Sequence, residues 1–121
     1  MTNEALPWPR ELRLRDGGRL LDVQFDSGEA YALSAELLRT HSPSAEVKGH
    51  GPGQEVLVTG KQNVRIRDIE PVGNYAVRLL FDDGHATGLY SWPYLLHLGR
   101  KRELLWARYL ERVAAHGSAA R

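Results

Sequence analysis

Residues 25–33 read FDSGEAYAL and residues 81–89 read FDDGHATGL, so the pattern Phe-Asp-x-Gly-x-Ala-x-x-Leu occurs twice in the chain. The Asp-x-Gly of each copy suits a tight hairpin turn, because glycine adopts the positive φ angles that such turns require. Polar and apolar residues alternate in residues 11–15 and 21–25, which is typical of half-buried strands. The repeat predicts two similar strand–turn–strand–helix units packed together. The alternative is that Asp-x-Gly turns simply recur in unrelated hairpins.

The other predicted elements extend outward from these hairpins. A short helix should follow each unit, at residues 35–39 and 94–98, and the Ser34 hydroxyl should cap the first of them. Further strands are expected around residues 56–58, 64–70, 75–81 and 85–89, and a hairpin turn at residues 16–18. Apolar residues at spacings of three and four predict an amphipathic C-terminal helix. This stripe consists of Leu105, Trp106, Tyr109, Leu110 and Val113.

The predicted fold class is α+β, with antiparallel sheets built from two similar hairpin-plus-helix units. The C-terminal helix is expected to pack on the sheets or on a second copy of the chain, which would make a homodimer. We divide the chain into an extended lead-in (1–10), a main domain (11–99), the C-terminal helix (100–116) and a frayed tail (117–121). A length of 121 residues suits one such domain.

Composition excludes several classes of site. The chain contains no cysteine, which rules out disulfides, thiolate metal sites and cysteine nucleophiles. Its 16 basic and 15 acidic residues nearly balance, whereas nucleic-acid and membrane-surface binders carry a one-sided charge. No apolar run approaches the roughly 20 residues that span a bilayer, and the first residues do not resemble a signal peptide. A cytoplasmic location is therefore expected.

Catalytic motifs are not evident in the sequence. There is no Gly-x-Ser-x-Gly nucleophile elbow and no phosphate-binding Walker loop. Adjacent carboxylates, as at Asp82 and Asp83, normally serve the turn in which they lie. These observations favour a protein that is not an enzyme.

A metal site is a second hypothesis, based on histidines. His41 and His50 bracket a loop rich in Gly, Ser and Pro at residues 41–54, and His85 follows the second hairpin turn. Loops of this length tend to be functional or mobile. If the loop folds over the hairpin, three imidazoles gather, and imidazole suits iron or zinc.

The same region contains residues that suit an interaction surface. Aromatic residues cluster at residues 90–94, and aromatic side chains are enriched among interface anchors, although core packing is the more common role. The candidate surface residues are Ser42, Ser44, Glu46, Asn74, Tyr75, Asp82, Asp83 and Trp92.

Three segments in order, residues 42–51, 69–76 and 81–92, resemble the gamma-butyrobetaine hydroxylase-like N-terminal domain family. The resemblance extends over roughly residues 12–99. The family's domain occurs alone in bacterial proteins of unassigned function, before the dioxygenase domain of carnitine-synthesis enzymes, and attached to P-loop scaffold proteins of iron–sulfur assembly. The resemblance therefore implies an accessory module associated with metal handling, without oxygenase chemistry of its own.

In the dioxygenase versions of the family, the resemblance implies a zinc site made of three cysteines and one histidine. The resemblance matches the histidine to His85 and the cysteines to Ser42, Ser44 and Val47. Serine and valine do not replace thiolates as zinc ligands. His41 and His50 remain as alternative nitrogen donors.

The leading functional hypothesis is a non-enzymatic accessory or binding module, an adaptor in iron or iron–sulfur metabolism. By analogy its partner would be an iron–sulfur assembly factor or an oxygenase-type protein, with no nucleic acid or membrane involved. The alternatives are a small metal-binding protein that uses His50 and His85 and, third, an enzyme with an unrecognised site.

Overall fold

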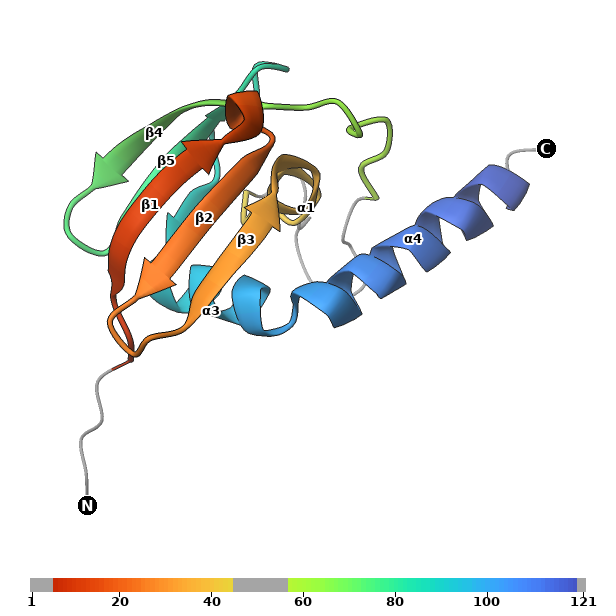
Figure 1. Cartoon of the computed structure of the whole chain (residues 1–121). Coiled ribbons are helices and arrows are strands. Elements are labelled where there is room, and N and C mark those ends of the chain that lie inside the picture. Colours follow the sequence, from red (N-terminus) through yellow and green to blue (C-terminus); the bar gives the residue numbers. More distant parts are fainter. Residues whose placement is uncertain (1–5, 45–56, 120–121) are drawn as a thin grey trace.

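The structure is a computed structural model that describes residues 6–44 and 57–119. Two three-stranded antiparallel sheets are each followed by a helix, and a long C-terminal helix completes the chain (Figure 1). Sheet A and its helix contain β1 (Pro9–Arg15), β2 (Leu20–Phe25), β3 (Ala30–Ser34) and α1 (Ala35–Thr40). Sheet B and the later helices are β4 (Ile66–Val72), β5 (Ala76–Phe81), β6 (Leu89–Ser91), α3 (Trp92–Arg100) and α4 (Arg102–Ala119). The predicted α+β class with a C-terminal helix is confirmed.

The two hairpins have matching turns. The N–H of Gly28 donates to Phe25 O over 3.0 Å, and the N–H of Gly84 donates to Phe81 O over 3.1 Å. Both glycines have positive φ, 94° and 92°, as the sequence pattern predicts. The two units therefore share the same turn.

The helix starts match as well. Ser34 caps α1 by accepting a hydrogen bond from the N–H of Leu37. Ser91 caps α3 in the same way through the N–H of Tyr94. Each hydroxyl satisfies one of the donors that the first turn of a helix leaves unpaired.

The second unit is one residue longer between its turn and its cap. In sheet A, Leu33 lies opposite Leu21. Val77 is the residue of sheet B that matches Leu21 in the repeat, and it lies opposite Tyr90. Leu89, the match to Leu33 by sequence, is 40% exposed. The predicted returning strand at residues 85–89 is therefore wrong in position, because residues 85–88 leave the ladder and only β6 pairs with β5.

One other local prediction needs correction. Residues 57 and 58 form no strand, and β4 begins only at Ile66. The hairpin turn predicted at residues 16–18 is confirmed, and these residues form a short 3-10 turn (η1) that joins β1 to β2. At its end Gly18 packs so tightly that an added Cβ would lie 2.3 Å from Ile66 O, where it would clash. Glycine at this position lets η1 approach the start of β4.

The core is shared by both sheets, α1 and α3. Figure 1 shows sheet A in front with β4 and β5 beside and behind it, and α1 and α3 lie near β3. The fully buried side chains come from all of these layers and include Leu21, Leu33, Leu38, Leu79, Tyr90 and Leu98. The two units therefore bury their apolar faces in one common core.

Helix α4 packs by its first half. Tyr109 is buried and its hydroxyl donates to Glu36 Oε2 over 3.1 Å, while Leu105 and Trp106 contact the core. Leu110 is 47% exposed, so the predicted stripe is wrong at this position. The C-terminal half of α4 extends away from the sheets (Figure 1). None of the helices in the described ranges is both long and apolar enough to span a membrane.

The C-terminal end of α1 is closed by two tyrosines of the second unit. The hydroxyl of Tyr90 donates to Leu38 O over 2.5 Å, and that of Tyr94 donates to His41 O over 2.6 Å. Carbonyls at a helix end have no partner within the helix. Burial raises the pKa of Tyr94 to about 12, so its hydroxyl remains a donor at physiological pH.

We expect Tyr90→Phe to lower the free energy of unfolding by about 1–3 kcal/mol, because it leaves the buried carbonyl of Leu38 without a donor. Urea denaturation of the full chain measures this loss. Tyr75→Phe is the control, since Tyr75 is 55% exposed. Equal stability of the two variants would show that the Tyr90 hydroxyl does not support α1.

Candidate functional site

Ser42 and His85 form a buried pair. Ser42 Oγ lies 2.9 Å from His85 Nε2 and also accepts a hydrogen bond from the N–H of Ser44 over 3.3 Å. Ser42 is 1% exposed and His85 is 7% exposed. The pair joins the segment after α1 to the second hairpin.

Gly88, in the unpaired segment before β6, packs closely on Ser42. A Cβ on Gly88 would lie 2.3 Å from Ser42 Oγ and 3.2 Å from the Pro43 ring. The backbone of Gly88 therefore packs directly on the serine. Because Ser42 is covered, it does not present its hydroxyl to solvent as an accessible nucleophile would.

Asp83 is the centre of an ionic cluster. Its Oδ2 lies 2.8 Å from Arg39 Nε and 2.7 Å from Lys61 Nζ, and its Oδ1 accepts from the N–H of His85 over 3.0 Å. Burial works against the charged carboxylate, but the hydrogen bonds from Lys61, His85 and Arg39 outweigh it and lower the pKa of Asp83 to about 2. Asp83 thus holds α1, the turn and Lys61 together.

His41 faces a different part of the molecule. Its Nδ1 donates to Leu37 O over 3.0 Å, and its ring lies 6.3 Å from the Tyr109 ring of α4. Burial lowers the pKa of His41, which the hydrogen bond to Leu37 partly offsets. His41 therefore belongs to the contact between α1 and α4.

The structure does not test the complete predicted metal site, because His50 and the matched position Val47 lie outside the described residues. Glu46 of the predicted interaction surface lies outside them as well. Within residues 6–44 and 57–119 there is no group of three His, Asp or Glu side chains that could hold a metal ion. His85 and His41 have separate surroundings, as described above. The metal hypothesis stays a prediction.

The predicted interaction residues divide into two groups. Ser42 and Ser44 are buried, so they do not lie on the surface, because Ser42 pairs with His85. Asp82 is exposed and accepts a hydrogen bond from the N–H of Arg65 through its side chain. Asn74, Tyr75 and Trp92 lie at the surface or partly buried next to it.

The exposed Trp8 and Tyr75 both adjoin the half-buried Trp92, and we call these three residues the aromatic patch. Trp8 is 48% exposed and Tyr75 is 55% exposed, and the ring centroids of Trp8 and Trp92 are 6.5 Å apart. The indole N–H of Trp92 donates to Asn74 O over 2.8 Å, and its backbone N–H donates to Tyr75 O over 3.1 Å. Sequence analysis missed Trp8, although a tryptophan between two prolines in an extended segment is an unusual place for a large apolar side chain.

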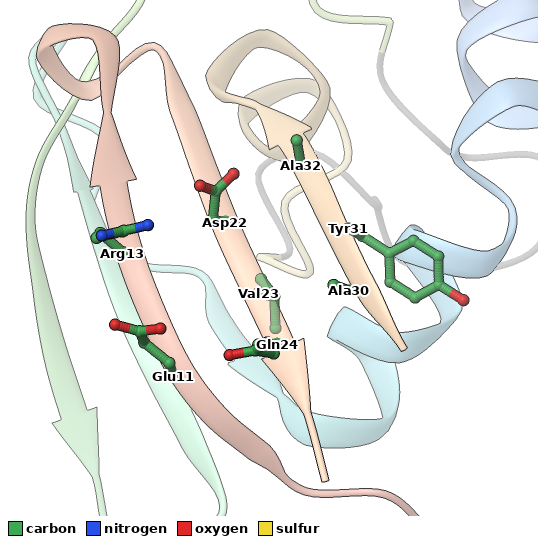
Figure 2. A pocket seen from close by; sticks show the side chains of 8 residues that line it. All are labelled: Glu11, Arg13, Asp22, Val23, Gln24, Ala30, Tyr31 and Ala32. Atoms are coloured by element: carbon green, nitrogen blue, oxygen red, sulfur yellow. The ribbon is translucent and has the colours of Figure 1, made fainter. Parts of the chain in front are cut away.

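A shallow hollow lies on the outer face of sheet A (Figure 2). Its volume is about 250 Å³, and the small side chains of Ala30 and Ala32 lie beside Arg13, Asp22 and Gln24. Asp22 is already paired with Arg15. The hollow is thus a polar face of sheet A, formed by other residues than the aromatic patch.

Comparison with known proteins agrees with the resemblance noted from the sequence. A family model described as gamma-butyrobetaine hydroxylase-like, N-terminal, matches residues 12–96. No curated protein matches significantly.

Solved structures match over most of the chain. One NMR solution structure is 50% identical, with a TM-score of 0.80, over 97% of this chain and 87% of the other. A second NMR structure is 43% identical, with a TM-score of 0.80, over 93% and 89%. A crystal structure of a DUF971 family protein of unknown function from Acidithiobacillus ferrooxidans is 37% identical, with a TM-score of 0.63, over 75% and 91%.

The zinc site that the resemblance implies requires three thiolates and an imidazole around one metal ion. Ser42 Oγ lies beside His85 Nε2, and Ser44 adjoins it through its backbone N–H, so these matched positions are neighbours. However, the serines contribute hydroxyl oxygens where zinc would need thiolates, and Ser42 lies within hydrogen-bond distance of the imidazole nitrogen Nε2. These residues do not fit that site.

We expect Asp83→Asn to flatten the acid end of the stability profile. The carboxylate has a folded-state pKa of about 2, below its ordinary value of 3.8, so its contribution is present above pH 3.8 and is lost as the pH falls toward 2. Denaturation at pH 6, 4 and 2.5 measures the slope, with the exposed Asp68→Asn as control. An unchanged slope in Asp83→Asn would contradict the role of this cluster.

For metals, we expect calorimetry with ferrous iron and with zinc to detect weak binding at most. Any binding through imidazole should weaken as the pH drops through about 6.5, because the ligand must be deprotonated. His85→Ala and His50→Ala identify the ligands. Tight binding, or binding that survives both substitutions, would contradict this assignment.

Proposed function

The chain belongs to the gamma-butyrobetaine hydroxylase-like N-terminal domain family, and from this premise we propose that it is a non-enzymatic accessory module that binds another protein. The aromatic patch is the binding surface. Its partner is a protein of iron or iron–sulfur metabolism, so that the chain acts as an adaptor.

The observation that supports this proposal most strongly is the exposure of Trp8 and Tyr75 beside Trp92. Leaving large aromatic surfaces in water forgoes the stabilisation that burial would give. Aromatic side chains are over-represented among the residues that dominate protein–protein binding energy. A surface cluster of this kind is therefore expected where another protein docks.

The patch is also held in place, which favours binding. Asp26 Oδ1 accepts from the N–H of Trp8 over 3.1 Å, and the N–H of Asp26 donates back to Trp8 O over 2.8 Å. Trp92 is tied to the backbone of Asn74 as described above. A surface that is ordered before binding loses less conformational entropy when the partner arrives.

The class of partner is inferred from the proteins in which the family's domain occurs. In the family that this chain resembles, the domain precedes a dioxygenase domain or is attached to a P-loop scaffold of iron–sulfur assembly. Where the domain is not fused to such a protein, it would meet it by non-covalent docking. This supports an iron–sulfur assembly factor or an oxygenase-type protein as the partner.

The test is affinity capture from a lysate of the native host with the full chain. We expect the parent to retain an iron–sulfur assembly factor or an oxygenase, and the double variant Trp8→Ala/Tyr75→Ala to lose it. Leu110→Ala is the matched control, because Leu110 is equally exposed but lies on α4. Equal capture by the patch variant, or retention of no such protein by the parent, would contradict the proposal.

A further inference from the structure

We propose that the groove between the start of α4 and the β3–α1 corner binds a small organic cation with an apolar body. The groove has a volume of about 360 Å³. Small-molecule sites usually measure roughly 300–1,000 Å³, so this groove can hold a compact ligand. It is formed by other residues than the aromatic patch, and the inference does not depend on the proposed protein partner.

The apolar part of the groove comes from three elements. Leu20 of β2, Leu37 of α1 and Trp106 of α4 line it. Leu37 is buried, whereas Leu20 and Trp106 are half-buried and keep part of their surface open to the groove. The small side chain of Ala32 lines it as well, on β3. An alkyl or cyclic body would cover this surface and exclude water from it.

Acidic residues outnumber basic residues in the lining of the groove. Glu36 and Glu103 line it, and within the described residues neither carboxylate forms an ion pair. The hydroxyl of Tyr109 donates to Glu36 Oε2 and so fixes the position of that carboxylate. A ligand with a positive charge would meet two carboxylates here.

The one basic residue of the lining, Arg102, is engaged elsewhere. Its Nη1 donates to Gly99 O over 2.8 Å, and its guanidinium carbon lies 5.0 Å from the centroid of the Tyr31 ring. The guanidinium therefore provides a donor for a carbonyl near the end of α3 and stacks on the Tyr31 ring of sheet A. It reduces the negative charge of the groove without pairing with Glu36 or Glu103.

Trp106 adds a second reason for a cation. Glu103 and Trp106 are three residues apart in α4, so their side chains lie on the same face of the helix. An ammonium group over an indole face is attracted by the negative face of the ring. The indole and the carboxylate thus favour the same charge, and both disfavour an anion.

The experiment titrates the full chain, labelled with 15N, with three probes of one shape: cyclohexylammonium, cyclohexanol and cyclohexanecarboxylate. The indole N–H signal of Trp106, assigned with Trp106→Phe, reports occupancy of the groove. We expect cyclohexylammonium to shift this signal with an affinity several-fold higher than that of cyclohexanol, and the carboxylate to bind most weakly. Equal affinities for the cation and the alcohol, or no shift of the Trp106 signal, would overturn the proposal.

Glu103→Gln separates charge from shape. It removes one carboxylate from an exposed position and should weaken cyclohexylammonium binding about two- to fivefold, as expected for a solvent-screened ion pair. Glu111→Gln, at an exposed position of the same helix outside the groove, is the matched control and should leave the affinity unchanged. An equal effect of the two substitutions would overturn the assignment of the ammonium to Glu103.

Discussion

The carbonyl groups at the end of α1 are the constraint on which the two units depend. A helix of six residues is too short to be stable by itself, and its last carbonyls have no partner within it. The hydroxyls of Tyr90 and Tyr94, both from the second unit, supply those partners. The end of the first unit's helix is therefore satisfied only in the presence of the second unit. The repeat in the sequence does not make two independent modules, because the second copy supplies the donors for the helix of the first.

Helix α1 contacts the elements that carry both candidate binding surfaces. Helix α3 carries Tyr94, which bonds to the end of α1, and starts at Trp92, whose ring belongs to the aromatic patch. Glu36, in the first turn of α1, accepts from Tyr109 and so fixes α4 beside the groove. A shift in the position of α1 would therefore displace residues of both the aromatic patch and the groove. Polar contacts of α1 therefore affect both surfaces.

Local chemistry made much of the fold predictable. Turn glycines and capping serines act within three or four residues, so the pattern identified both hairpin turns and the start of α1 at its cap Ser34. It placed the second helix at residues 94–98, whereas α3 begins at Trp92 after the cap Ser91. Leu89 matches Leu33 in the repeat, but Tyr90 takes the corresponding place in the core. This shift could not be predicted, because the additional residue before Ser91 becomes evident only from the strand pairing. Ser42 was assigned to the surface because a serine in a polar loop is normally solvated. Its burial depends on His85, a contact between residues 43 positions apart.

The pair of Ser42 and His85 also bears on how a domain of this kind is held together. Three thiolates and an imidazole around zinc would join the segment after α1 to the second hairpin by coordination. In this chain a hydrogen bond between a hydroxyl and an imidazole joins the same two segments, with Gly88 packed on the serine and Asp83 fixing the turn through Arg39 and Lys61. A buried hydrogen bond can perform this structural task only if water is kept out and its neighbours are paired. The polar cluster is therefore explained by the stability of the fold, which leaves the exposed aromatic rings as the feature that the fold itself does not need.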